Sequence, residues 1–276
     1  MICSIVFFPE DRKFIVADNE TIYRYSAEKE LIPTAEPAEN LMVADSWLVS
    51  DGHVRALHLH QQRFTSSCTQ LAGIKPDDIT GFWHQAMQKL PEEGLWFPRI
   101  ELAGNIRQPV LQLRIRKAPD IHQDIRLINC GLKDFRKKPR HKGPDLTELM
   151  TVRKVMMEQG ADDAILTTPK GFLLEGLTTS LLWWEGKTLC TTPLSRRVLP
   201  GITCQLLRLI AEQENIAFAC RFRKPATLNG CDVWAVNALH GIRRVVDWKH
   251  SPFRPSVQTD IEDWRKKLDQ FMKKVF

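Results

Sequence analysis

Hydrophobic and polar positions alternate along several short stretches of the chain, which is the pattern of strands with one buried face. The clearest stretch is residues 110–115, where leucine and isoleucine alternate with valine, glutamine and arginine. A second strand is predicted at residues 99–102 and paired with it. An Asp-Gly turn separates residues 41–49 from residues 54–57, and this predicts a hairpin.

The first part of the chain combines these strands with helices. Residues 60–70 and 79–90 carry apolar residues at helical spacing, and a proline ends the second of them. A Lys-Ala-Pro-Asp stretch near residue 118 then breaks the pattern. The sequence therefore predicts two α/β domains, residues 1–118 and residues 122–276.

The second part begins with a predicted helix that Asp145 caps and Gly160 ends, with Glu148 placed to reciprocate the cap. Another helix is predicted at residues 203–213, and a closing helix runs from residue 261 to the end. Short strands lie between these helices. They are predicted at residues 164–168, 172–174, 178–184, 187–191, 217–222, 233–237 and 244–247.

The composition, 43% hydrophobic and 26% charged, is that of a soluble globular protein with a sizeable core. No apolar run approaches the roughly 20 residues that span a bilayer. Residues 1–8 are apolar but lack a basic flank and a cleavage site, so they predict a first strand rather than a signal peptide. Seven scattered cysteines, none at metal-ligand spacing, predict reduced thiols, no metal and a cytoplasmic location.

The net charge of +6 raises the question of an anionic partner. A basic surface attracts nucleic acid or any other anion. The charge is spread along the chain apart from a local run at residues 136–142, and no aromatic residues interleave this run as they would in a platform for single strands. A solvated loop beside an anion site is the favoured interpretation, with no nucleic-acid partner.

Lys142 and Glu175 are the first candidates for chemistry. A lysine attacks an aldehyde only after losing its proton, so its site must exclude water or add positive charge. Lys142 has Arg140 nearby and comes just before the predicted start of a helix, whose end carries partial positive charge. Glu175 follows an apolar strand, where a carboxylate could keep a ring nitrogen protonated. Each residue alone is more simply a surface or strand-end charge.

A third segment, the Pro-Gly-Ile-Thr of residues 200–203, opens a predicted helix. Its backbone N–H groups and helix dipole suit a phosphate, although alone it is an ordinary helix start. An arginine should complete such a site, because its planar fork matches phosphate oxygens. A lysine, a carboxylate and a glycine turn into a helix, in this order, predict a site for pyridoxal 5'-phosphate.

These segments follow one another as in the class IV aminotransferases, which the chain resembles over nearly its whole length. These are the pyridoxal phosphate enzymes of fold type IV, and they include branched-chain and D-amino acid aminotransferases and aminodeoxychorismate lyase. The spacing between Lys142 and Glu175 also matches the family, and residues 160–203 resemble it most. The resemblance implies a mixed α/β (α+β) fold with a small N-terminal α/β domain, a larger C-terminal domain with a barrel-like sheet, the cofactor between them, and a homodimer.

The resemblance also assigns roles to residues. Lys142 would be the Schiff-base lysine and proton shuttle, and Glu175 would hold the pyridine nitrogen. Arg63, in a His-x-x-Arg helix that begins at His60, would bind the phosphate. Lys142 is thus the predicted catalytic residue, and the predicted cofactor-binding residues are Arg63, Lys142, Glu175, Ser180, Ile202, Thr203, Ala238 and Leu239.

Three positions depart from the family's pattern. Ser180 replaces the usual asparagine, and Cys204 replaces the arginine that many members carry. Thr147 replaces a tyrosine of the branched-chain members, which argues against a branched-chain specialist. The first two changes concern rate and substrate more than cofactor binding.

The leading prediction is an aminotransferase that acts on an amino or keto acid through a lysine aldimine. The alternative is aminodeoxychorismate lyase, which makes 4-aminobenzoate with the same lysine, and residues 237–239 favour it. A third hypothesis is a catalytically inactive member that serves as a binding protein. Retention of Lys142, Glu175 and Arg63 argues against that third hypothesis.

Overall fold

A computed structural model describes residues 20–129, 131–194 and 197–275 of the chain. Its first sheet has five strands in the order β2-β1-β8-β7-β3. The predicted pairing of residues 99–102 with 110–115 is confirmed, because β7 and β8 run antiparallel with Leu102 opposite Leu111. The strands are β1 (Glu20–Tyr25), β2 (Leu31–Thr34), β3 (Val43–Ser46), β7 (Arg99–Asn105) and β8 (Gln108–Arg116).

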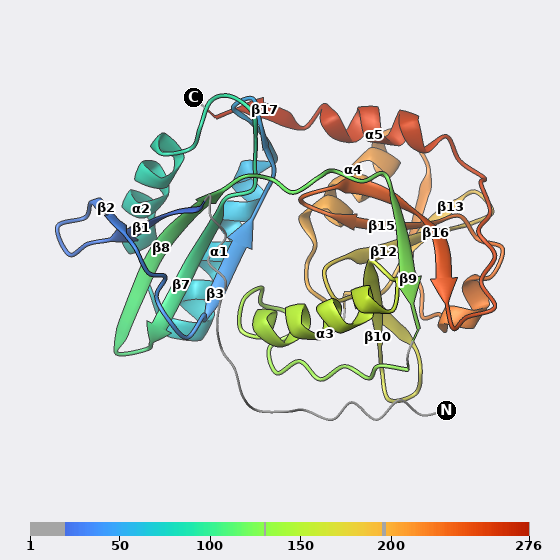
Figure 1. Ribbon diagram of the computed structural model, residues 1–276. Coiled ribbons are helices and arrows are strands. Elements are labelled where there is room, and N and C mark those ends of the chain that lie inside the picture. Colours follow the sequence, from blue (N-terminus) through green and yellow to red (C-terminus); the bar gives the residue numbers. More distant parts are fainter. Residues whose placement is uncertain (1–19, 130, 195–196, 276) are drawn as a thin grey trace.

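Two helices cover this sheet, α1 (Leu57–Ala72) and α2 (Pro76–Gln88), and both were predicted from their apolar spacing. They pack their buried side chains against the sheet, with Phe64 from α1 and Phe82 from α2 in the same apolar cluster as Ile100. Figure 1 shows both helices beside β3, β7 and β8. The apolar face that period-two alternation predicted is therefore the buried face.

The predicted hairpin forms, but its first strand is divided. The pair β4 (Val49–Ser50) and β5 (His53–Arg55) is antiparallel, as expected from the Asp-Gly turn. Residues 41–49 do not form one strand, because β3 belongs to the five-stranded sheet and β4 to a four-stranded sheet ordered β17-β5-β4-β6. Between them Trp47 turns into the core, where it is 1% exposed. In this second sheet β6 is Leu95–Trp96.

The predicted closing helix is too long. Helix α5 (Ile261–Asp269) ends early, and the chain continues as strand β17 (Met272–Lys274). This strand pairs antiparallel with β5, so the C-terminal segment joins a sheet built from the first part of the chain. The backbone N–H of Ala56 donates to the carbonyl of Phe271, which extends the contact.

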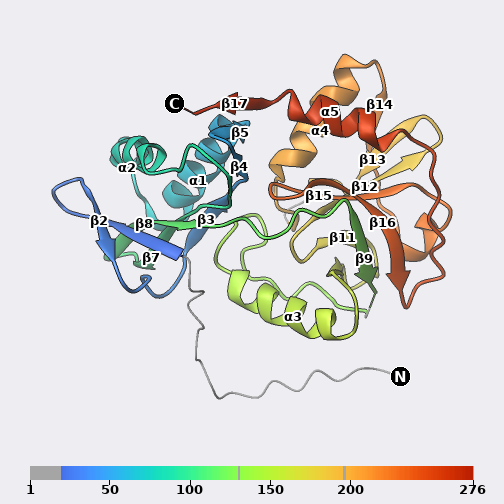
Figure 2. The same ribbon diagram turned by 45° about the horizontal axis from the view of Figure 1, so that its top comes forward.

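The largest sheet has eight strands in the order β11-β10-β9-β16-β15-β12-β13-β14. It is curled, with helices α4 (Ile202–Gln213) and α5 on one side and α3 (Leu146–Glu158) on the other (Figures 1 and 2). A short 3-10 helix, η1 (Pro225–Leu228), precedes β15. The strands are β9 (Asp124–Ile128), β10 (Asp163–Thr167), β11 (Leu173–Gly176), β12 (Ser180–Glu185), β13 (Thr188–Thr191), β14 (Ala217–Cys220), β15 (Val233–Asn237) and β16 (Gly241–Lys249).

The predicted boundary between residues 118 and 122 falls in the segment that joins β8 to β9, and the division into two domains stays a prediction. The predicted first strand, residues 1–8, lies outside the described residues. The five cysteines in the described part of the chain are free. Within that same part, no helix is long and apolar enough to cross a membrane, and no group of three or more His, Cys, Asp or Glu side chains is placed to hold a metal ion.

Candidate active site

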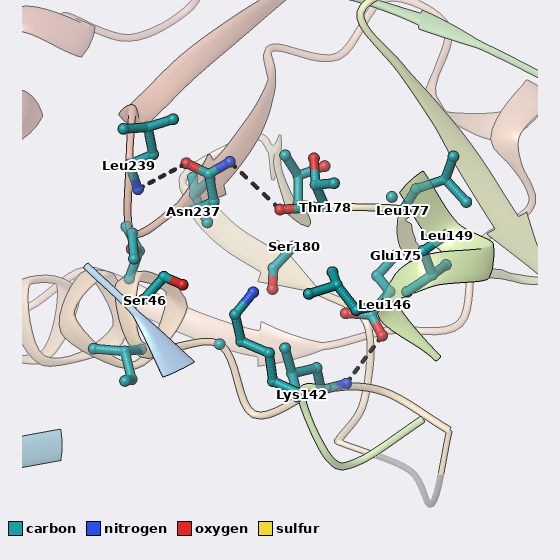
Figure 3. A pocket seen from close by; sticks show the side chains of 18 of the residues that line it. Ser46, Lys142, Leu146, Leu149, Glu175, Leu177, Thr178, Ser180, Asn237 and Leu239 are labelled. Atoms are coloured by element: carbon teal, nitrogen blue, oxygen red, sulfur yellow. Dashed lines mark hydrogen bonds between the residues drawn. The ribbon is translucent and has the colours of Figure 1, made fainter. Parts of the chain in front are cut away.

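A cavity of about 370 Å³ lies between the five-stranded and eight-stranded sheets. All eight residues predicted from the sequence line it, although they come from distant parts of the chain. Figure 3 shows Lys142 at its centre, with Ser180 and Glu175 nearby. The structure thus brings together Arg63, Lys142, Glu175, Ser180, Ile202, Thr203, Ala238 and Leu239.

The backbone around Lys142 is held against strand β3. The N–H of Ala44 donates to the carbonyl of Lys142 at 2.7 Å. The next residue, Gly143, has a φ of 130°, and a Cβ there would lie 2.7 Å from the backbone of Val43. Only glycine allows this approach. The approach fixes the loop so that the Lys142 amine points into the cavity toward Ser180 (Figure 3).

The Lys142 amine is poised to lose its proton. Burial is the main cause that lowers the pKa of Lys142 to about 8; the positive charge of Arg63 acts in the same direction, and Asp45 opposes both. Arg99 and Arg116 add smaller effects in the same direction. The sequence predicted that Arg140 would lower this pKa, and that prediction is wrong. Arg140 is exposed, and it is not among the charges that shift the pKa of Lys142. Arginines distant in sequence supply the charge.

Asp145 is the N-cap residue of α3, as predicted, but the predicted capping hydrogen bond does not form. Asp145 directly precedes the helix, but its carboxylate makes no bond to the first turn. It accepts the backbone N–H groups of Lys137 and Lys138 instead, both at 2.8 Å. These donors belong to the loop that leads to Lys142, so Asp145 ties that loop to the start of α3.

Glu175 lies in β11, and burial raises its pKa to about 7. Arg136 opposes this rise, because its guanidinium contacts the Glu175 carboxylate directly. The N–H of Leu199 donates to the same oxygen, Oε1, at 3.0 Å. Asp134 in turn holds Arg136, at 2.8 Å. Arg136 is thus buried, and the prediction of a solvated basic loop is wrong for this residue.

Gly201 is the N-cap of α4, where the glycine turn was predicted to bind phosphate. A Cβ at Gly201 would lie 2.6 Å from Oγ of Ser180, so glycine lets α4 begin directly beside β12. The first N–H groups of a helix have no partner within it. The N–H groups of Ile202 and Thr203 therefore lie at the cavity, at the partly positive N-terminus of α4.

Arg63 approaches the same end of the cavity from α1. Its Nε and one terminal nitrogen donate to the two oxygens of Asp45, both at 2.8 Å, and its other terminal nitrogen donates to the carbonyl of Pro200 at 3.1 Å. The ring of His60 bonds the same carboxylate at 2.8 Å. Although burial opposes ionisation, Arg63 and His60 hold the pKa of Asp45 well below its usual range.

The turn after β15 closes the cavity opposite Lys142. The side-chain oxygen of Asn237 accepts the N–H groups of Leu239 and His240, and its amide donates to the carbonyl of Thr178 at 3.4 Å (Figure 3). Thr178 is itself held by the buried carboxylate of Asp163. This chain of hydrogen bonds sets the shape of the wall that contains Ala238.

The family model for amino-transferase class IV matches residues 42–248, which is most of the chain and includes every residue of the candidate site. The chain belongs to the class IV aminotransferases. This confirms the resemblance and the mixed α/β fold predicted from the sequence. Enzymes of this family use pyridoxal phosphate, in agreement with the predicted cofactor. Comparison with curated proteins gave no match.

Solved structures of class IV aminotransferases share this fold. A hypothetical aminotransferase from Mycobacterium tuberculosis has 19% identity and a TM-score of 0.75, over 92% of this chain and 98% of that chain. A branched-chain aminotransferase from Thermoproteus uzoniensis, solved with norvaline, has 14% identity and a TM-score of 0.74, over 93% and 99%. A candidate 4-amino-4-deoxychorismate lyase from Legionella pneumophila has 21% identity and a TM-score of 0.70, over 86% and 97%.

Two of the three departures from the usual class IV aminotransferase pattern lie at the cavity. Ser180 and Cys204 line it beside the start of α4, whereas Thr147 is exposed on α3 and does not. Sequence reasoning missed Asp45 and Arg136, which hold Arg63 and Glu175. Asp45 gave a weak signal, a charge inside an apolar strand, and Arg136 gave none within its basic run.

Proposed function

We propose that this protein is a pyridoxal phosphate-dependent aminotransferase that acts on an amino or keto acid. The observation that supports this best is the position of Lys142, whose amine has a depressed pKa and points into the cavity. Glu175 and the start of α4 line the same cavity. The cavity thus contains the three groups that the cofactor requires: a lysine for its aldehyde, a carboxylate for its ring nitrogen and a helix N-terminus for its phosphate.

The residues present fit this cofactor. The described hydrogen bonds to Glu175 use only Oε1, which leaves Oε2 for the ring N–H. The N–H groups at the start of α4 suit the phosphate, and Arg63 adds positive charge beside them. Lys142 supplies the amine that binds the aldehyde. We infer that Arg136 is a positioning residue, because its guanidinium contacts the carboxylate of Glu175 and orients it.

Bound in this way, the cofactor would act as an electron sink for the substrate's carbon. Lys142, when its amine is free, would take a proton at Nζ from that carbon and return it at a neighbouring position. Glu175 would keep a proton at the ring nitrogen. Burial of these groups excludes water and strengthens the electrostatic interactions among them.

Aminodeoxychorismate lyase is the second candidate, and the turn at Asn237, Ala238 and Leu239 supports it. The turn forms part of the cavity wall and resembles the lyase branch of the family. The same lysine and carboxylate would serve an elimination. A homodimer and a cytoplasmic location are also proposed for this chain, from the family resemblance and from the scattered cysteines. An inactive binding protein would not need to retain a lysine with a depressed pKa.

The test is an absorbance spectrum of the purified protein after incubation with pyridoxal phosphate and desalting. Borohydride reduction and peptide mapping then identify the attached residue. We expect a new band near the visible edge and a label at Lys142. A protein that takes up no cofactor would overturn the proposal. Assays with amino donors and with aminodeoxychorismate then separate the two candidates.

A second test concerns Glu175. The variant Glu175→Gln should still take up the cofactor, because lysine and phosphate contacts remain, but its turnover should fall on the order of a hundredfold or more. Glu158→Gln, an exposed residue at the end of α3, is the control and should keep full turnover. Unchanged turnover in Glu175→Gln would remove this residue from the cofactor's ring.

A further inference from the structure

Arg243, in strand β16, is a buried cation without a partner among the residues that the structure describes. It is 2% exposed and lines the cavity. Its side chain makes no hydrogen bond or ion pair with any residue that the structure describes, and its Nε is completely buried. A buried charge of this kind is costly unless something compensates it.

The two carboxylates that attract Arg243 do not pair with it, because each accepts hydrogen bonds from other groups. Asp163 accepts the N–H of Ala164 and three donors from Thr178 and Thr179. The oxygens of Asp162 bind the guanidinium of Arg126. The two acids attract Arg243 at a distance without pairing with it. The guanidinium therefore keeps its donors for a ligand in the cavity.

A second arginine adds to the positive charge at this place. Arg153, from α3, also lines the cavity, and its one hydrogen bond within the described part of the chain is from Nε to the carbonyl of Asp162 at 3.0 Å. His240, which lines the cavity next to these arginines, contributes no positive charge, because its Nδ1 accepts the N–H of His122. Burial, together with the charge of Arg243, lowers the pKa of His240 to about 3. The site is thus formed by two arginines with unused donors.

This place is separate from the end of the cavity where α4 begins. At that end Arg63 contacts Pro200, directly before Gly201 and the first turn of α4. The charges that act on Arg243 come instead from Asp162 and Asp163, at the start of strand β10, and from Arg153 in α3, which lies on the other side of the eight-stranded sheet from α4 (Figures 1 and 2). An anion bound at Arg243 would therefore be different from the phosphate that the start of α4 would hold.

We propose that Arg243 and Arg153 form a subsite that binds a carboxylate of the substrate. The proposal rests on the proposed function, because it assumes that a substrate enters this cavity. Two arginine forks match the oxygens of a carboxylate, and charge-assisted hydrogen bonds of this kind are about twice as strong as neutral ones. Arg243 would then determine specificity by excluding substrates that leave it without a partner.

The experiment titrates the cofactor-loaded protein with glutarate and with pentanamide in a calorimeter. Glutarate carries carboxylates but neither an amine nor a keto group, so it binds without reacting, and pentanamide is a neutral probe of similar length. We expect Arg243→Gln to weaken glutarate binding about tenfold to a hundredfold. Arg153→Gln should weaken it less. Pentanamide affinity should stay the same in all variants.

Two further variants serve as controls. Arg208→Gln removes an exposed arginine of α4, paired with Glu212, and should leave glutarate affinity unchanged. Arg243→Lys keeps the charge and should recover part of the lost affinity. If Arg243→Gln does not fold, as a thermal unfolding curve will show, Arg153→Gln and Arg243→Lys decide the question.

Three results would overturn the proposal. One is equal glutarate affinity in the wild type and a folded Arg243→Gln. Another is an equal loss for pentanamide, which would indicate a structural defect. The last is loss of cofactor uptake with unchanged glutarate affinity, which would assign Arg243 to the phosphate. Failure of the wild type to take up cofactor overturns the proposed function separately, because glutarate binding is also measured without cofactor.

Discussion

The arginines at the two ends of the cavity differ in whether a carboxylate of the protein binds them. Where α4 begins, Arg63 is held by both oxygens of Asp45 and by the carbonyl of Pro200. Where α3 meets β16, Arg243 has no such partner among the described residues. The first guanidinium has a fixed orientation before any ligand arrives, and the second has a charge that the protein leaves uncompensated.

This difference fits two kinds of ligand. A resident cofactor benefits from a preorganised site, because little is lost in ordering the side chain when it binds. A substrate exchanges in every turnover. A cation without a partner in the empty site binds a carboxylate more favourably than a neutral group, which gives selectivity for a carboxylate. The two ends therefore differ in the way that a permanent and an exchanging ligand require.

The largest effect is expected between the two ends, at Lys142. Lys142→Ala removes the amine that both attaches the cofactor and moves the proton, so activity should fall by a thousandfold or more, since general acid–base catalysis alone contributes about 10²–10⁴-fold. Steady-state assay and borohydride labelling measure the two losses. Lys170→Ala, in the exposed turn between β10 and β11, should behave as wild type. Retained labelling in Lys142→Ala would place the attachment elsewhere.

The next effect tests the clamp on Arg63. Asp45→Asn removes a buried charge that faces both Arg63 and His60, and breaking a buried pair of this kind costs about 3–5 kcal/mol of unfolding free energy. Urea unfolding of the cofactor-free protein measures it. Asp263→Asn breaks an exposed pair with Lys267 and should cost at most about 1 kcal/mol. Equal costs would mean that Asp45 gives Arg63 no special support.

A smaller effect compares the two arginines directly. Arg63→Gln should weaken cofactor affinity about tenfold to a hundredfold, because one charge near the phosphate is lost. Arg243→Gln should leave cofactor affinity nearly unchanged. Equilibrium titration with pyridoxal phosphate, followed by absorbance, gives both values. A reversed order would exchange the roles of the two ends.

The smallest effect is a dependence on pH. The Lys142 amine, with a pKa of about 8 instead of 10.5, should attach cofactor faster as pH rises, by up to tenfold per unit, and level off above pH 8. Stopped-flow absorbance measures the rate. The same depressed pKa means that between pH 8 and 10.5 the unfolded chain holds the extra proton, so its contribution to stability increases with pH. A rate that keeps rising to pH 10 would indicate an ordinary lysine.

The sequence predicted the elements and the cavity residues well where the pattern is local. Periodicity identified α1, α2 and the pair β7–β8, and a recognisable order of segments identified Lys142 and Glu175. It failed where a side chain bonds outside its own element, as when Asp145 bonds the preceding loop in place of its helix. Arg136 and Arg243 look like ordinary basic residues until the fold buries them beside the cavity.

Strand β17 has a consequence for how the cavity can open. The chain passes from the five-stranded to the eight-stranded sheet at residues 117–123, and it leaves the second part of the molecule again just before β17, which pairs with β5 in the four-stranded sheet. If the two predicted domains move relative to each other, these two connections favour a rotation about the line that joins them. An opening of that kind would follow this axis unless β17 first separates from β5.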